Sequence, residues 1–95
     1  MVIEIATLFV KNGAEGHFTS EFTEAVEILK RQPGCNGLRW GKRVEPDLAF
    51  VLEVDWAQIE DHFHFRETED YKTFGGYFRN HLSKAPEVVH FQPSS

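Results

Sequence analysis

The spacing of apolar residues changes early in the chain from a strand pattern to a helix pattern. Residues 2–10 are apolar on both alternating faces, which predicts a strand that is covered on both sides. After a turn at Lys11-Asn12-Gly13, apolar side chains recur at three- and four-residue spacing to about Arg31, which predicts an amphipathic helix. Pro33-Gly34 ends this helix. Its apolar stripe consists of Phe18, Phe22, Ala25, Val26 and Leu29.

The remainder of the chain predicts a hairpin, two helices and a closing strand. Residues 37–44 and 48–55 are expected to be antiparallel strands joined by a turn at Glu45-Pro46-Asp47. Asp55 is expected to cap the N-terminus of the next helix. The later elements are a helix over 57–66, a break near Glu67-Thr68, a helix from about Glu69 to Leu82, and a strand over 87–92 after Pro86.

This order of elements predicts an α+β fold. The β-α-β-β-α-β succession is the ferredoxin-like arrangement, a four-stranded antiparallel sheet with its helices on one face. With 95 residues, the chain is expected to form a single domain over residues 1–95. The other face of the sheet also carries apolar residues and needs a partner, so we expect two sheets to pack face to face as a homodimeric α+β barrel.

Composition narrows the classes of partner. The net charge is −5, with fifteen acids against ten bases, which argues against a nucleic-acid surface. The lone cysteine, Cys35, excludes an internal disulfide and fits a reducing, cytoplasmic setting. No apolar run approaches the roughly 20 residues of a membrane helix, and no secretory signal is visible. Nine Phe, two Trp and two Tyr exceed what a thin core needs, which indicates a shared apolar face or a lined cavity.

Glu4 is the first candidate for chemistry. It interrupts the apolar row of Val2, Ala6, Leu8 and Val10 on the first strand. A dry carboxylate there would have a raised pKa and would suit a general base or acid. The alternative is that Glu4 lies at the frayed start of the strand and reaches solvent or an ion-pair partner.

Histidines supply further candidates. His62 and His64 share a helix, but their spacing lets only one of them face a pocket. His90 lies on the last strand, in a row with Val88 and Gln92 that would point into a barrel cavity. A metal site built from these three histidines is not expected, whereas an acid–base role suits a side chain that titrates near neutrality. Surface and interface positions are the ordinary alternative for all three.

Aromatic residues are the candidate walls of a cavity. Tyr71 and Tyr77 offer phenolic hydroxyls, and Tyr71 is the candidate for a catalytic role. The expected substrate-binding side chains are Trp40, Phe63, Phe65, Phe74, Tyr77 and Phe78. Core packing is the alternative for each of them. The chain has no phosphate loop and no dinucleotide fingerprint, so we expect any reaction to proceed without a cofactor.

Several segments resemble the antibiotic biosynthesis monooxygenase family of dimeric α+β barrels. The resemblance covers nearly the whole chain, and its clearest motifs are Pro33-Gly34-Cys35 with Gly37, Phe50-Val51-Leu52-Glu53 with Trp56, and Tyr71-Lys72 with Phe74. It implies the barrel fold and a homodimer. The superfamily includes quinone-forming monooxygenases, haem-degrading enzymes and polyketide cyclases, so it implies no single reaction.

Two segments are similar to the olivetolic acid cyclase branch of stress-responsive barrels. They are Trp40-Gly41-Lys42 with Val44, and Phe74-Gly75 with Phe78-Arg79. Glu4, Tyr71 and Phe65 stand where that branch has a pocket histidine, its catalytic histidine and a pocket tyrosine. In the haem-degrading branch the axial histidine falls near Gly75, so haem binding is not expected.

These observations give three functional hypotheses. The first is a cofactor-independent enzyme that removes a proton next to a carbonyl of a hydrophobic aromatic or polyketide-like molecule, leading to cyclisation. The second is a cofactor-free monooxygenase of an aromatic or quinol substrate. The third is a dimer without catalysis that binds a small molecule or acts only as an assembly module.

Overall fold

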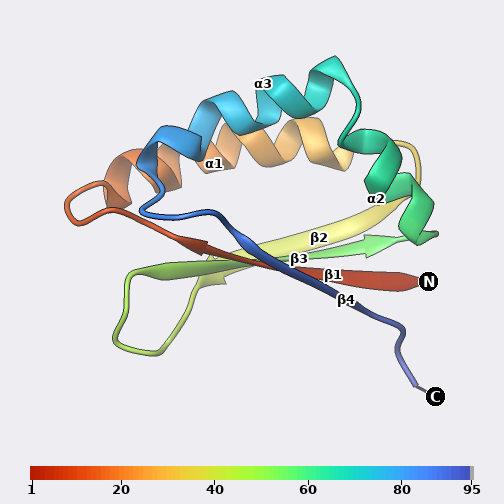
Figure 1. The fold of residues 1–95 in the computed structure, drawn as a ribbon, viewed down its shortest axis with the longest axis horizontal. Helices are drawn as coiled ribbons and strands as arrows, with labels where there is room; N and C mark the ends of the chain where they lie inside the picture. The colour runs from red at the N-terminus through yellow and green to blue at the C-terminus, as the bar shows by residue number, and fades with distance from the viewer. Residues whose placement is uncertain (95) are drawn as a thin grey trace.

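The computed structural model describes residues 1–94, which form an antiparallel sheet with helices packed on one of its faces (Figure 1). The strands are β1 (Val2–Phe9), β2 (Cys35–Lys42), β3 (Ala49–Trp56) and β4 (Glu87–Phe91), in the spatial order β2-β3-β1-β4. The helices are α1 (Glu15–Lys30), α2 (Ile59–Phe65) and α3 (Glu69–Phe78), with a 3₁₀ turn η1 (Arg79–His81). The ferredoxin-like prediction is therefore confirmed, in the form β-α-β-β-α-α-β.

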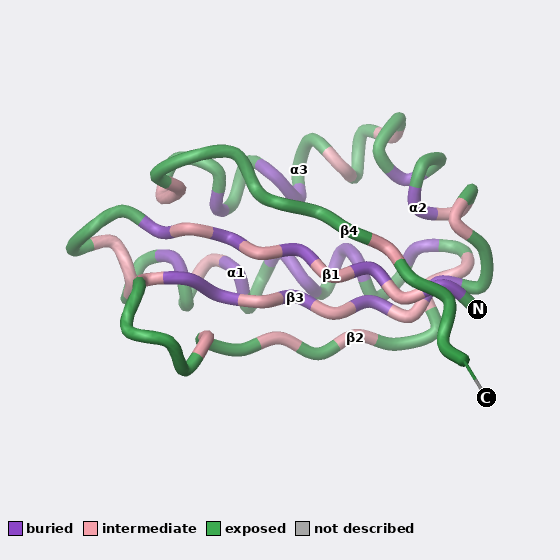
Figure 2. Tube along the Cα trace, turned by 60° about the horizontal axis from the view of Figure 1, so that its bottom comes forward, coloured by how far each residue is buried: buried purple, intermediate pink, exposed green. Residues whose placement is uncertain are grey.

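Burial alternates along the two central strands and is low along the two edge strands (Figure 2). On β1 and β3, every second residue faces the helices and is buried, while its neighbours on the outer face are half-buried. A period of two is what a sheet with one covered face requires. The helix-facing row of β1 is Val2, Glu4, Ala6 and Leu8, so Glu4 is a buried carboxylate rather than a solvent-exposed strand end.

The core between sheet and helices is mainly aromatic. All five members of the predicted α1 stripe are buried. Phe22 packs edge-on against Trp40 and Phe78, with ring centroids 4.9 and 5.0 Å apart. Such edge-to-face pairs stabilise packing beyond the area that they bury. This cluster holds α1 and α3 against the sheet. The space under α2 is not part of the cluster.

Two boundary predictions were wrong. Asp55 does not cap a helix: it lies in β3 opposite Ile3, and α2 begins after Gln58, whose backbone N–H donates to Oδ2 of Asp61 (3.2 Å). The helix predicted to reach Leu82 ends at Phe78. Leu82 instead forms a bridge with Val10 at the sheet edge, and this pairing requires an extended backbone.

Three contacts fix where α2 and α3 sit. The Gln32 side chain at the end of α1 donates to Oδ2 of Asp70 in the first turn of α3 (2.9 Å). The N–H of Ala57 donates to the carbonyl of Gly34 (2.8 Å). Gly34 has φ +85°, and a Cβ there would come within 2.6 Å of the Asp61 Cβ, so glycine is required both for the turn and for the approach of α2.

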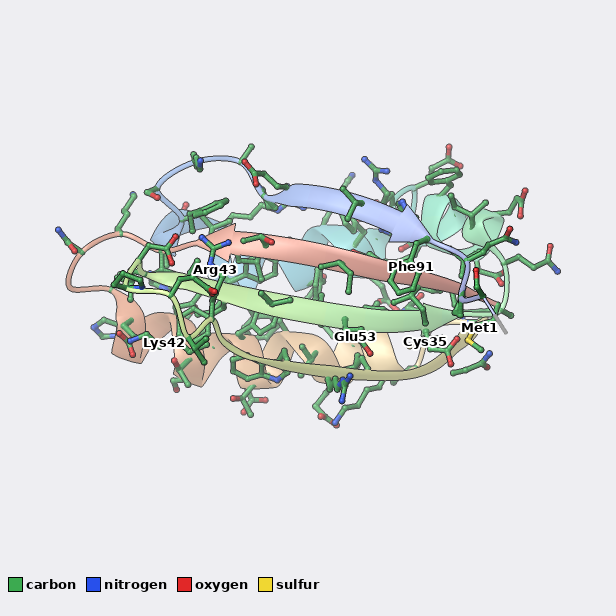
Figure 3. All side chains as sticks on the ribbon, turned by 90° about the horizontal axis from the view of Figure 1, so that it is seen from below. Met1, Cys35, Lys42, Arg43, Glu53 and Phe91 are labelled. Atoms are coloured by element: carbon green, nitrogen blue, oxygen red, sulfur yellow. The ribbon has the colours of Figure 1, made fainter. Side chains whose placement is uncertain are left out.

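The outer face of the sheet carries no helix in the described chain (Figure 3). Phe91 and Val89 of β4 are 50% and 61% exposed on this side. Ile3, Ile5 and Val51 are half-buried there. Asp55 lies in the same layer, and its Oδ1 is buried with no hydrogen-bond partner among residues 1–94. None of the helices in that range has the length and apolar character needed to span a membrane.

Candidate active site

A cavity of about 80 Å³ lies between the sheet and the helices. Its floor comes from the helix-facing residues of β1, β3 and β4, and its roof comes from α1, α2 and α3. The apolar lining consists of Ala6, Leu8, Phe22, Leu29, Leu52, Phe65, Tyr71, Phe74, Phe78, Pro86 and Val88. Four further lining residues are charged or titratable: Glu4, His62, Arg66 and Arg79. An apolar cavity with a few convergent polar groups is the usual form of a small-molecule site.

Glu4 is the centre of the polar end. Its Oε1 accepts a hydrogen bond from the indole Nε1–H of Trp56 (2.9 Å) and lies 3.4 Å from Nε2 of His62. The side chains of Glu4 and His62 are each 7% exposed. The Trp56 ring stacks on the His62 ring at 5.3 Å with 12° between their planes, which fixes the position of the imidazole. The carboxylate is therefore dry, oriented and in contact with one donor.

A second hydrogen bond extends this arrangement towards the sheet edge. Nδ1 of His62 lies 2.8 Å from Nε2 of His90, and which ring donates depends on the tautomer. His90 pairs with Glu4 across β1 and β4, so both side chains point to the helix face. His90 is only half-buried. The order Trp56, Glu4, His62, His90 thus connects a buried carboxylate to a residue that solvent reaches.

Burial shifts the titration of all three groups. It raises the pKa of Glu4, although the Trp56 hydrogen bond and the Arg66 charge act in the opposite direction. Burial, together with the charges of His90 and Arg66, lowers the pKa of His62 to about 4. The pKa of His90 is also lowered, by burial and by Arg66. At neutral pH His62 is therefore an uncharged imidazole beside a carboxyl group that is more basic than usual.

The structure places six of the sequence-predicted site residues on the cavity: Glu4, His62, Phe65, Tyr71, Phe74 and Phe78. It also answers which of the two helix histidines faces inward, because His62 is buried and His64 is exposed on the other side of α2. His90 lies one hydrogen bond away from the cavity lining. Glu4 and Tyr71, the expected base and acid, both line the cavity.

The remaining predicted walls lie elsewhere. Trp40 packs on Phe22 and Phe50 and does not line the cavity. Phe63 is 45% exposed and covers the outside of the His62–His90 pair. Tyr77 is on the exposed side of α3. Sequence periodicity shows which residues share a face, but it does not show which part of that face borders the cavity. That depends on how the helices pack on the sheet.

Sequence reasoning missed three residues of the site. Trp56 was assigned to the connection after a strand, whereas β3 continues through it and pairs it with Val2. Arg66 follows His62 by four residues, a spacing that places both on one side of a helix and could have identified it. Arg79 gave no such signal, since an arginine near a helix end is usually solvated.

The polar groups do not form a metal site. No cluster of three or more His, Cys, Asp or Glu side chains suited to a metal ion occurs within residues 1–94. His62 and His90 direct their facing nitrogens at each other. The geometry instead suits proton transfer, because each polar group is within reach of the next.

The family model for antibiotic biosynthesis monooxygenase matches residues 1–77. The uncharacterised protein YczJ of Bacillus subtilis is 31% identical over 93 residues, covering 97% of this chain and 98% of YczJ. A Bordetella bronchiseptica protein provisionally classed as an antibiotic biosynthesis monooxygenase superposes with a TM-score of 0.92 at 26% identity, covering 99% of this chain and 97% of the other. SnoaB, a cofactor-independent oxygenase of Streptomyces nogalater, superposes with a TM-score of 0.83 at 18% identity, covering 99% and 93%.

Proposed function

The chain belongs to the antibiotic biosynthesis monooxygenase family, and on that basis we propose that it is a cofactor-independent oxygenase of a small aromatic molecule. Its first step is removal of a substrate proton by Glu4. The observation that carries this proposal is the buried Glu4 carboxylate at the end of an apolar cavity, held by Trp56 and linked through His62 to His90. The likeness in fold to SnoaB, itself a cofactor-independent oxygenase, supports the absence of a cofactor in the reaction.

Cavity size limits the substrate. The volume of about 80 Å³ is smaller than the roughly 150 Å³ of an engineered apolar cavity that admits benzene. One aromatic ring therefore fills the enclosed space once the lining side chains adjust, and the rest of the molecule extends to the mouth. A one-ring or two-ring phenol or hydroquinone fits this description better than a large polycyclic molecule.

The reaction needs only dioxygen as a second reactant. The keto tautomer of a phenol has a ring CH₂ group that its carbonyl activates. This group loses a proton to Glu4, and the resulting carbanion forms a C–O bond with O₂ and takes up a proton to give a hydroperoxide. Loss of the second C–H proton and cleavage of the O–O bond then leave a carbonyl and water. The sum is R₂CH₂ + O₂ giving R₂C=O + H₂O, with all four electrons supplied by the substrate.

His62 and His90 clear the proton from the base. Protonated Glu4 gives its proton to Nε2 of His62 while the Nδ1 proton of His62 passes to Nε2 of His90. His90 then releases its own Nδ1 proton to solvent. Each ring accepts one proton and donates one, so the Glu4 carboxylate is restored and neither imidazole keeps a charge.

Cyclisation shares the same first step. If the carbanion attacks a second carbonyl of its own chain instead of O₂, an aldol ring closure results and no oxygen is consumed. The family match and the fold neighbours favour oxygenation as the first candidate. The third hypothesis is a binding protein without catalysis. It predicts that no compound is turned over, whether or not Glu4 is replaced.

The proposed assembly is a homodimer formed through the outer face of the sheet, in a reducing cytoplasm where the thiol of Cys35 stays free. The exposed Val89 and Phe91 and the half-buried outer residues of β1 and β3 give that face its apolar character. The buried, unpartnered Oδ1 of Asp55 lies in the same layer and would accept a hydrogen bond from the second copy.

Oxygen uptake tests the function. The purified protein is mixed with a panel of one-ring and two-ring phenols and hydroquinones, and O₂ consumption is compared with the rate without protein. Glu4→Gln keeps the Trp56 hydrogen bond but removes the base, so we expect kcat to fall by roughly 10²- to 10⁴-fold. Glu60→Gln, an exposed change on α2, is the matched control and should leave the rate unchanged. Product formation without O₂ consumption would identify a cyclase, and full activity of Glu4→Gln would refute the assignment of the base.

A further inference from the structure

Two arginines that have no role in the proposed reaction line the cavity. Arg66 follows α2 and Arg79 follows α3, and both are exposed residues whose side chains reach the cavity lining. Neither forms an ion pair with any acid in residues 1–94, although the chain as a whole carries five more acids than bases. Two guanidinium groups without ion-pair partners among these residues therefore belong to exposed residues that line an apolar cavity.

The guanidinium group of Arg79 is held in place by its own helix. It lies over the ring of Tyr71, with Cζ 4.9 Å from the ring centroid, which is a cation–π contact. It also rests against Gly75, where an added Cβ would come within 2.9 Å of Cζ. The absence of a side chain at Gly75 and the flat ring of Tyr71 together form a seat for this group beside the cavity.

Arg66 acts on the polar end of the same cavity. It lines the cavity together with Glu4 and His62, and its positive charge lowers the pKa of Glu4, His62 and His90. Its Cζ lies 6.0 Å from the Phe63 ring centroid, on the flank of α2. Two positive groups therefore line a cavity whose other walls are mainly apolar.

We propose that Arg66 and Arg79 bind an acidic group of the substrate, so that the natural substrate is an aromatic acid whose carboxylate stays at the mouth while its ring enters the cavity. The enclosed volume supports this placement, because a molecule longer than one ring must extend beyond the enclosed space, and the two arginines are exposed residues of its lining. Planar guanidinium groups match carboxylates in shape and charge. This inference rests on the proposed function only in taking this cavity as the substrate site.

A matched pair of probes tests the acidic group separately from the ring. 2-Naphthoate and the neutral 2-naphthamide have nearly the same shape and differ in charge. Binding is followed by the two indole N–H signals in a ¹H–¹⁵N correlation spectrum. Trp56 contacts Glu4 beside the cavity, whereas Trp40 lies outside the cavity lining and serves as an internal control. We expect 2-naphthoate to shift the Trp56 signal at roughly tenfold or more lower concentration than 2-naphthamide.

Variants assign that preference to the two residues. Arg66→Gln and Arg79→Gln should each weaken 2-naphthoate binding by roughly tenfold and leave 2-naphthamide unchanged. Gly75→Ala keeps every charge but displaces the Arg79 guanidinium, so it should also weaken only the acid. Arg31→Gln, an exposed arginine at the end of α1 that lines no part of the cavity, should change neither probe.

The outcomes separate this inference from the proposed function. Equal binding of the acid and the amide would overturn the inference while leaving the cavity as the site of the reaction. An acid preference that survives in the Arg66→Gln/Arg79→Gln double variant would overturn the assignment to these residues. If neither probe moves the Trp56 signal, the cavity is not a ligand site and both proposals fail. Acid preference without any O₂ consumption would sustain the inference and count against the oxygenase.

Discussion

Three residues at the polar end of the cavity, Glu4, His62 and His90, lie in one series of close contacts but differ in access to solvent. Glu4 and His62 are buried and His90 is half-buried. Desolvation disfavours the charged form of each group, so the carboxyl group becomes a stronger base and the imidazoles become weaker ones. The result is a carboxylate that is a stronger base than usual beside two rings that are less readily charged than usual.

The pKa of His62 makes a prediction about stability. Because burial lowers that pKa from 6.5 to about 4, the unfolded chain binds a proton between these pH values that the folded chain does not. The free energy of unfolding should therefore decrease as pH falls from 6.5 to 4, and His62 alone accounts for a decrease of up to about 3 kcal/mol. Urea denaturation at several pH values measures the loss, and His62→Gln, which cannot titrate, should show less of it.

The same residue has a direct spectroscopic signature. In ¹⁵N-histidine spectra, the His62 ring should keep the shifts of a neutral imidazole until the pH approaches 4. The raised pKa of Glu4 makes an opposite contribution to stability above pH 4.5, because the unfolded chain loses that proton at lower pH than the folded chain does. A His62 ring that becomes charged near pH 6.5 would contradict the burial argument.

The sequence could single out Glu4 but not its partners. A carboxylate among Val2, Ala6 and Leu8 is conspicuous because the alternation of a strand decides its face. His62 and His64 are equivalent at the level of spacing, and only the seating of α2 on the sheet separates them. Arg79 was missed for a similar reason, since no local pattern distinguishes its seated guanidinium from a solvated one, whereas the spacing of Arg66 from His62 was an available signal.

At the scale of elements, α2 is a seven-residue helix whose position carries the chemistry, because His62 belongs to it and Arg66 follows it. A helix this short has little stability of its own, so its contacts fix it in place. The main anchor is the turn around Gly34, which packs against Asp61 and accepts the Ala57 N–H. The anchor lies at the end of α1, far along the chain from the histidine that it positions.

Replacing Gly34 tests this anchor against a matched control. Gly13 and Gly34 have nearly the same positive φ, 83° and 85°, so alanine at either position bears a similar backbone cost of about 1–2 kcal/mol. A Cβ at Gly13 meets nothing within 4 Å, whereas at Gly34 it displaces Asp61. Gly34→Ala should therefore lower the free energy of unfolding by at least about 1 kcal/mol more than Gly13→Ala.

Urea denaturation gives both values, and the Trp56 indole signal reports on the site. That signal should move in Gly34→Ala and stay in place in Gly13→Ala, because α2 stacks His62 on the Trp56 ring. Equal destabilisation by the two substitutions would mean that the Gly34–Asp61 contact does not position α2.

Element order was predictable because period-two and period-3.6 patterns are local properties of the sequence. The strands of the structure agree with the predicted ones to within two residues at each end. The wrong N-cap at Asp55 and the overlong helix before Leu82 share a cause. In both places, pairing with a distant strand segment extends the backbone where local propensity favours a helix or a cap.

At the scale of the whole molecule, the sheet has two different faces. The helix face encloses the cavity, and the outer face presents an apolar layer with no cover in the described chain (Figure 3). Sequence alone predicted that this face needs a partner, because both alternating rows of the first strand are apolar. The identity of that partner depends on surface shape, which no periodicity encodes.

The proposed homodimer makes a prediction with an internal control. Val89 and Val44 are both exposed valines, but Val89 lies on the outer face of β4 and Val44 lies in the loop after β2. Val89→Lys places a charge in the proposed interface and should convert a dimer into a monomer in sedimentation velocity at micromolar concentration. Val44→Lys should sediment like the unchanged protein. A monomeric unchanged protein would refute the homodimer.

Strand β4 has a consequence for how the chemistry is encoded along the chain. The N–H of Ser83 is anchored to the carbonyl of Phe9, and β4 resumes pairing at Glu87. The segment between these points sets which residues of β4 point inward. Removing one residue from it would slip the strand by one position, sending His90 to the outer surface and Phe91 towards His62. The length of an exposed connection with no catalytic side chain is thus itself a determinant of the proton path.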